Sequence, residues 1–381
     1  MPSGVEMPST RTDVGTVEDL HASATRLTGL DDFGEDDGYR EGLGALLSAY
    51  GTEAALTPMG SKVSRGMLRA ALVSRLLSEA AWQQHPEHAD VPVPRPVFVT
   101  GLPRTGTTAL HRLLTADPAH QGPELWLTEA PQPRPPRDTW ESNPFFAALQ
   151  AGYERHHVAD PEFMGVHYIA ADQVEECWRL LVQSMASVSF ECIAHIPSYS
   201  AWLDAHDWTD AYRRHRRNLQ LIGLNDPDRR WVLKNPSHLF ALDALLAVYP
   251  DAVVIQTHRA PRTVIASVCS LNAHASEGWS ELFRGEVLGR AQLEVWSRGL
   301  RRFAIERERH DSAHFIDVDY DDFVADPIGM VESVYERIGS TLTAEARAAM
   351  TSLQAEPRGP AHRYDLADFG LTPADVDAAF D

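Results

Sequence analysis

Residues 96–114 read PVFVTGLPRTGTTALHRLL, and this stretch decides the fold. A short run of β-branched and aromatic residues leads into a loop bounded by Gly101 and Gly106, and a helical pattern opens on Thr107 and Thr108. A glycine loop at the start of a helix exposes several backbone N–H groups, which suit a phosphate. The stretch therefore predicts a strand, a phosphate-binding loop and a helix.

The loop has nearly the spacing of the nucleotide-binding motif G-x-x-x-x-G-K-[ST]. Both glycines fit, but Thr107 occupies the lysine position, and Arg104 is the loop's only cation. NTP hydrolysis and kinase chemistry normally use that lysine. The sequence thus indicates a loop that binds an anion without the lysine of the nucleotide-binding motif.

A second segment, residues 253–267, reads VVIQTHRAPRTVIAS and repeats the strand-to-helix pattern. We expect a buried strand to end at Arg259, Pro261 to begin a helix, and Ser267 to lie two turns into that helix. A planar arginine fork and a serine hydroxyl on either side of such a corner can close on one phosphate. Arg259 and Ser267 are therefore candidate ligands of a further phosphate.

The composition bounds the class of protein. The chain has 381 residues, of which 44% are hydrophobic, and this is ample for a large α/β domain. Its formal charge of 34 − 54 = −20 disfavours nucleic acid and anionic membranes as partners. Three cysteines without metal-like spacing and a polar N-terminus favour a reduced, cytoplasmic protein. No apolar run is long enough to predict a membrane span.

Strands and helices alternate in the predicted core. This alternation indicates an α/β fold with a mostly parallel sheet that helices cover on both faces. We expect residues 1–94 to form an N-terminal helical region, and residues 95–381 to form the α/β domain with a helical insertion at 138–225. Strands are predicted near 97–100, 230–234, 252–257 and 314–318, and helices near 17–20, 39–50, 63–82, 107–116, 237–248, 262–272 and 328–338.

Together, the two phosphate segments resemble those of the sulfotransferases that use 3′-phosphoadenosine-5′-phosphosulfate (PAPS). Residues 103–108 resemble the family's 5′-phosphosulfate loop, and Arg259 with Ser267 resembles its 3′-phosphate motif. Residues 231–239, 318–327 and 362–371 are similar to further segments of the family, the last to a bacterial branch. The resemblance implies a P-loop-like sulfotransferase that moves a sulfuryl group from PAPS to a hydroxyl of a small or medium-sized lipid, phenol or secondary metabolite.

The resemblance also implies roles for individual residues. Lys234 would stabilise either the charge that develops on the oxygen bridging phosphate and sulfur or the sulfuryl group itself. Tyr320 would approach the adenine, and Arg363 is a weaker candidate for the 3′-phosphate. The 5′-phosphosulfate would be held by Arg104, which is also a candidate catalytic residue, and by Thr105, Gly106, Thr107 and Thr108.

Two residues are the leading candidates for the base that removes the acceptor proton, and Glu129 is a further possibility. His238 follows Asn235 and Pro236, a fitting N-cap and first helical residue, so the helix end and Lys234 should lower its pKa. Glu124 lies about where tyrosylprotein sulfotransferases place a catalytic glutamate, although the Trp-Glu pair of many bacterial relatives is absent here. The choice between the two stays open at this stage.

Two other classes of function compete with a sulfotransferase. One is a P-loop phosphotransferase that uses ATP, and the absence of a lysine at position 107 argues against it. The other is a nucleotide-sensing protein without turnover, and the presence of Lys234 and His238 argues against that. No metal is expected, because His156, His157 and His167 lack complementary ligand spacing. The acceptor, its pocket within the insertion and the oligomeric state are not predicted.

Overall fold

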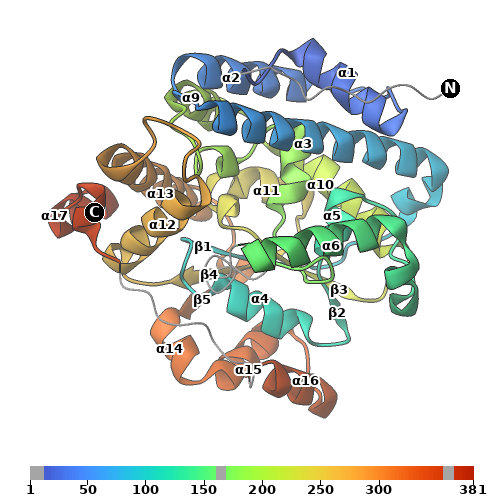
Figure 1. Cartoon of the computed structure of the whole chain (residues 1–381). Coiled ribbons are helices and arrows are strands. Elements are labelled where there is room, and N and C mark those ends of the chain that lie inside the picture. Colours follow the sequence, from blue (N-terminus) through green and yellow to red (C-terminus); the bar gives the residue numbers. More distant parts are fainter. Residues whose placement is uncertain (1–12, 160–168, 355–363) are drawn as a thin grey trace.

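The structure is a computed structural model that describes residues 13–159, 169–354 and 364–381 (Figure 1). At its centre is a five-stranded sheet in the order β2-β3-β1-β4-β5, and all four neighbouring pairs are parallel. Four strands lie within one residue of their predicted ranges, whereas the short edge strand β2 is not predicted by the sequence. The strands are β1 (Val97–Gly101), β2 (His120–Gln121), β3 (Arg230–Lys234), β4 (Val253–His258) and β5 (Phe315–Asp319).

Side chains alternate between the two faces of the sheet, as they must in extended chain. In β1, Val97 and Val99 belong to a core cluster that includes residues of α4, α15 and α16, whereas Phe98 belongs to the larger cluster on the opposite face. In Figure 1, α4 and α14–α16 lie below the strands, and the N-terminal helices lie at the top. The prediction of a parallel sheet covered on both faces is therefore confirmed.

The helices account for most of the described chain. α3 begins five residues before its apolar pattern, because Thr57 caps it and Pro58 is its first residue. The prediction of one helix over 237–248 is wrong, since the chain leaves helical geometry at Ala241 (φ −155°, ψ 44°) and forms a 3-10 helix and then α11. The α-helices are α1 (Val17–Thr28), α2 (Gly38–Thr52), α3 (Pro58–Gln84), α4 (Thr107–Thr115), α5 (Leu125–Glu129), α6 (Pro144–Ala159), α8 (Trp178–Leu181), α9 (Pro197–Ala205), α10 (Thr209–Ile222), α11 (Leu242–Val248), α12 (Pro261–Ala275), α13 (Gly285–Arg307), α14 (Tyr320–Ala325), α15 (Pro327–Ile338), α16 (Ala344–Gln354) and α17 (Pro373–Phe380). The 3-10 helices are η1 (Pro86–Asp90), η2 (Arg137–Ser142), η3 (Val182–Ser184), η4 (Val188–Phe190), η5 (Gly223–Asn225), η6 (Pro236–Phe240), η7 (Ser312–His314) and η8 (Leu366–Phe369).

A buried arginine of α3 ties the N-terminal helices to the rest of the molecule. The guanidinium of Arg75 donates to the carbonyl oxygens of Phe33 (2.7 Å), Asp36 (2.8 Å) and Gln183 (3.1 Å). Its burial lowers its pKa from the ordinary value, and the ring of Tyr39 lies 3.9 Å from its central carbon. The N-terminal region and the insertion thus share one buried cation, while the predicted domain boundary stays a prediction.

The turn out of β1 depends on a glycine. Gly101 has φ 139°, and a Cβ at this position would lie 2.5 Å from Thr257 Oγ1 and 2.6 Å from the Thr257 carbonyl oxygen of β4. No L side chain fits so close to a neighbouring strand, and few adopt this φ. Only glycine therefore lets β1 run beside β4 up to the start of the loop.

We expect Gly101→Ala to lower the free energy of unfolding by about 2 kcal/mol or more, because it adds backbone strain and a steric overlap. Urea denaturation measures this change. The matched control is Gly44→Ala in α2, where no atom lies within 4 Å of the added Cβ. That substitution should stabilise the protein by about 0.5–1 kcal/mol. Equal stability of the two variants would show that the loop tolerates a side chain at Gly101.

Candidate active site

The predicted motifs meet at one edge of the sheet. Because all strand pairs are parallel, the carboxyl ends of β1, β3 and β4 lie at the same edge. Gly101 ends β1, Lys234 ends β3, and Arg259 follows the last residue of β4. Ligands of open α/β sheets bind outside the carboxyl ends of strands. β1 is the central strand of the three, so its loop lies between Lys234 and Arg259.

The N-terminus of α4 lacks a side-chain cap. Its N-cap is Gly106, with φ 85° and ψ 4°, and no side chain of the described residues caps the helix. The first N–H groups of a helix have no partner within it and carry partial positive charge, so they can receive an anion. The hydroxyl of Thr105 instead donates to the Leu102 carbonyl oxygen (2.6 Å) and lies 2.5 Å from Thr257 Oγ1. The Thr105 side chain therefore fixes the backbone of the loop and joins the loop to β4.

The two phosphate segments are in direct contact. Arg104 Nε donates to Ser267 Oγ at 3.2 Å, and Arg259 Nη1 donates to the Arg104 carbonyl oxygen at 2.9 Å. The central carbon of the Arg259 guanidinium lies 3.8 Å from the centre of the Tyr320 ring. The structure therefore brings together four residues that the sequence analysis proposed as ligands, although Arg104 and Ser267 are 163 positions apart.

Lys234 has a partner that the sequence analysis did not identify. Its Nζ donates to Thr108 Oγ1 at 3.2 Å and forms an ion pair with Glu176 Oε1. The Cys177 N–H donates to the Lys234 carbonyl oxygen at 3.0 Å, which fixes this part of the insertion against the end of β3. The available signal was the acidic pair Glu175–Glu176, which interrupts a segment otherwise rich in apolar and aromatic residues.

His238 lies in the core rather than beside Lys234. It is fully buried, its Nδ1 lies 2.7 Å from the Tyr212 hydroxyl, and its ring packs edge-on against Phe98 at 5.1 Å. Phe98 faces the larger core, whereas Lys234 shares the other face of the sheet with Val232. Burial, with smaller effects of nearby cationic groups, holds the pKa of His238 well below its ordinary value. No hydrogen bond among the described residues joins the side chain of His238 to the loop or to Lys234, although the charge of Lys234 contributes to this lowering.

Glu124 takes part in a different polar network. Its carboxylate accepts from Arg134 Nε at 3.1 and 3.0 Å, and Arg134 also donates to Gln121 (2.6 Å) and Asp226 (2.9 Å). Burial raises the pKa of Glu124, and the adjacent Arg134 opposes this effect. The structure thus places Glu124 in an ion pair at the edge of the sheet. Arg363 lies outside the described residues.

A family model described as "Sulfotransferase family" matches residues 96–344, which include both phosphate segments, Glu176 and Lys234. The chain belongs to the sulfotransferase family. The predicted family and fold are thereby confirmed, and the ATP-dependent phosphotransferase is not favoured.

Two solved structures resemble this sulfotransferase over almost its whole length. The crystal structure of sulfotransferase STF1 from Mycobacterium tuberculosis H37Rv is 60% identical in sequence, with a TM-score of 0.92 over 97% of this chain and 99% of that one. The crystal structure of STF9 from Mycobacterium avium is 29% identical, with a TM-score of 0.87 over 98% of this chain and 96% of that one.

The name of a curated relative states its acceptor. The omega-hydroxy-beta-dihydromenaquinone-9 sulfotransferase Stf3 of Mycobacterium tuberculosis is 26% identical over 264 residues. This match spans 64% of the present sulfotransferase and 62% of the relative's length. In the part of the chain that the structure describes, no helix has both the length and the apolar character needed to cross a membrane.

For the sulfotransferase we expect Glu124→Gln to act mainly on stability. Loss of the charge beside Arg134 should lower the free energy of unfolding by about 1–3 kcal/mol and leave kcat within tenfold of the unmodified protein. The control is Glu141→Gln, because Glu141 and its partner Arg137 are both exposed and such pairs contribute about 1 kcal/mol or less. A hundredfold loss of kcat at unchanged stability would instead identify Glu124 as the base.

Proposed function

We propose that the protein transfers the sulfuryl group of PAPS to a hydroxyl group of a small or medium-sized acceptor with an apolar body. The contact of Arg104 with both Ser267 and Arg259 carries this proposal, because it unites the candidate ligands of two phosphates in one cluster. PAPS has one phosphate at the 3′ position and a phosphosulfate at the 5′ position. The acceptor class is suggested by the relative Stf3, whose name gives a hydroxylated menaquinone derivative as its acceptor.

The residues at the edge of the sheet fit such a donor. Arg104 and the N-terminus of α4 would hold the 5′-phosphosulfate, and Arg259 with Ser267 would hold the 3′-phosphate. A Cβ on Gly106 would lie 3.3 Å from both Tyr320 and Phe323, so the loop passes close to these rings. When bound, PAPS supplies the sulfuryl group, whose bond to the leaving phosphate breaks as its bond to the acceptor oxygen forms. These local cations act against a chain charge of −20.

We assign the base to Glu176 rather than to His238 or Glu124. Its carboxylate touches Lys234 beside Thr108, which lies in the first turn of α4. Lys234 and the helix end would stabilise the negative charge of the leaving phosphate, and Glu176 would take the proton of the acceptor hydroxyl. The lysine side chain is only 3% exposed, so its charge acts with little screening by water.

Binding of 3′,5′-adenosine diphosphate tests the donor. At about 100 times its Kd, this nucleotide should stabilise the fold by roughly 2.7 kcal/mol, measured as a thermal shift, while ATP with Mg²⁺ should not. Arg259→Lys should weaken the binding at least tenfold, because a lysine cannot form the same planar fork. Arg262→Lys is the control, since Arg262 is exposed and pairs with Asp377. A thermal shift with ATP and Mg²⁺ alone would overturn the proposal that PAPS is the donor.

Substitution of Glu176 tests the base. We expect Glu176→Gln to lower kcat by about 10²–10⁴-fold, the usual contribution of a general base, with the Kd for 3′,5′-adenosine diphosphate within threefold. Single-turnover kinetics with saturating donor and acceptor measure the chemical step. His238→Asn is the comparison. It should lower the free energy of unfolding, because His238 is buried against Tyr212, and it should change kcat less than Glu176→Gln does. The opposite pattern of effects would transfer the role of base to His238.

A further inference from the structure

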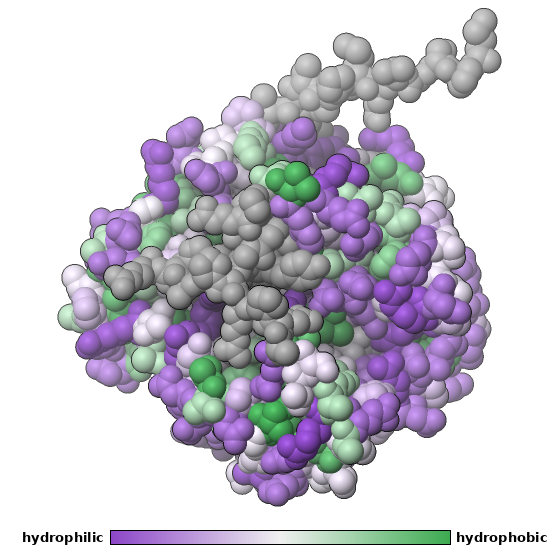
Figure 2. All heavy atoms as spheres, turned by 60° about the horizontal axis from the view of Figure 1, so that its bottom comes forward, coloured by the Kyte–Doolittle hydropathy of each residue, from purple (hydrophilic) through white to green (hydrophobic). Residues whose placement is uncertain are grey.

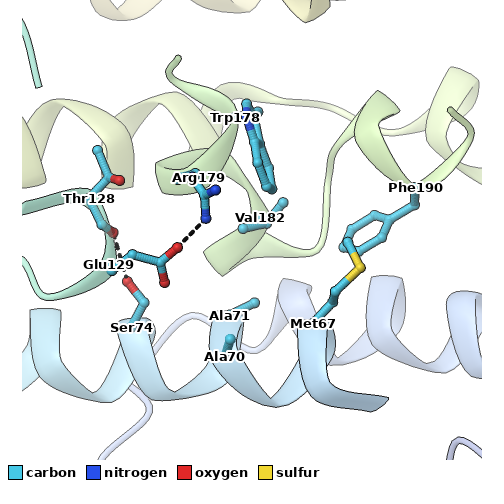
Figure 3. A pocket seen from close by; sticks show the side chains of 10 residues that line it. All are labelled: Met67, Ala70, Ala71, Ser74, Thr128, Glu129, Trp178, Arg179, Val182 and Phe190. Atoms are coloured by element: carbon cyan, nitrogen blue, oxygen red, sulfur yellow. Dashed lines mark hydrogen bonds and ion pairs between the residues drawn. The ribbon is translucent and has the colours of Figure 1, made fainter. Parts of the chain in front are cut away.

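A cavity of about 90 Å³ lies between α3 and the insertion (Figure 3). One of its walls is a face of α3, and the opposite wall is formed by α8 and the segments that follow it. Ala70 is an exposed residue of α3, so it lies at the mouth of the cavity. The lining residues are Met67, Ala70, Ala71, Ser74, Thr128, Glu129, Trp178, Arg179, Val182 and Phe190.

The charged side chains of this cavity pair with each other, although Arg179 Nε has no hydrogen-bond partner among the described residues. Arg179 forms an ion pair with Glu129, and the Ser74 hydroxyl donates to the Thr128 carbonyl oxygen at 3.1 Å. Figure 3 shows these four residues toward one end, whereas Met67 and Phe190 lie at the other end. Because the charges of Arg179 and Glu129 neutralise each other and most of the other lining side chains are apolar, the space between the walls favours an apolar ligand.

The cavity and the proposed base belong to one short run of sequence. Glu176 contacts Lys234, the Cys177 N–H is bonded to the Lys234 carbonyl oxygen, and Trp178 and Arg179 line the cavity. The end of β3 therefore fixes both the carboxylate and the cavity wall that follows it. The proposed base thus directly precedes, in the chain, the segment that forms one wall of the cavity.

We infer that the cavity binds an alkyl segment of the acceptor close to the hydroxyl that is sulfated. The inference rests on the proposed function, because it takes Glu176, which precedes the lining residues Trp178 and Arg179 in the chain, as the base that meets the acceptor. About 10–15 Å³ of such free space is enough for one water molecule, so the 90 Å³ here holds a short aliphatic group. The coloured part of the face seen in Figure 2 is mainly hydrophilic, with small separate apolar areas.

A series of 4-alkylphenols, from phenol to 4-hexylphenol, measures the size of the site. In the presence of saturating PAPS, kcat/KM should rise about fourfold with each of the first methylenes and then level off once the alkyl group fills the cavity. Binding of the same phenols to the protein saturated with 3′,5′-adenosine diphosphate should follow the same order. This second measurement does not depend on turnover.

Ala70→Phe is the decisive variant, because it places a ring at the mouth of the cavity from an exposed helical position. We expect it to lower the kcat/KM for 4-butylphenol at least tenfold while changing that for phenol less than threefold. Ala348→Phe is the matched control, since Ala348 is exposed on α16 and does not line the cavity. It should behave as the unmodified protein does.

The outcomes separate the two proposals. Absence of binding of 3′,5′-adenosine diphosphate overturns the proposed function. Intact nucleotide binding and turnover, with a kcat/KM that does not change with alkyl length or with Ala70→Phe, overturns the cavity inference alone. An equal loss in Ala348→Phe also overturns it, because the effect would then not arise at the cavity.

Discussion

The carbonyl oxygen of Arg104 is the point on which the site depends. Arg104 has φ 66°, a conformation that costs a non-glycine residue about 1 kcal/mol or more, and Arg259 donates to its carbonyl oxygen. With the backbone turned in this way, the Arg104 side chain reaches Ser267 on α12. The hydrogen bond thus couples a strained loop residue to the strand next to it, and the two phosphate segments become one surface.

Strand order makes that bond possible. β1 pairs with β4 in register from Val97↔Val253 to Gly101↔Thr257, so the segments that follow the two strands start side by side. Thr105 and Thr257 then join the loop to β4 through their hydroxyl groups, in addition to the backbone ladder. A glycine at position 101 keeps the two strands at this distance. The pairing of β1 with β4 therefore sets where Arg104 and Arg259 lie relative to each other, and the loop adds the remaining contacts.

Much of this arrangement could be predicted from the sequence. Apolar runs locate four strands, and the parallel pairing predicted from their alternation with helices brings the ends of β1, β3 and β4 to one edge. The contact between Glu176 and Lys234 could not be predicted in this way. It depends on how the insertion packs, and the aromatic composition of the insertion gives no periodicity that would fix its path.

His238 shows a different limit of sequence analysis. His238 follows Lys234 closely enough in the sequence to share a site with it. However, a strand directs successive side chains to opposite faces, and after the turn through Asn235 and Pro236 the ring of His238 packs against Phe98. Glu124 forms an ion pair with Arg134. In both cases the residue type suits the chemistry, while packing gives the side chain another environment.

The buried guanidinium of Arg75 has a consequence for the order of folding. Two of its acceptors, Phe33 and Asp36, precede it in the chain, but Gln183 lies 108 positions later. A cation that leaves water before its acceptors are in place pays a large solvation penalty. During synthesis, which proceeds from the N-terminus, helix α3 is complete long before residue 183 exists. The N-terminal helices can therefore reach their final packing only after Gln183 has been made. Their packing follows the synthesis of the insertion and does not precede it.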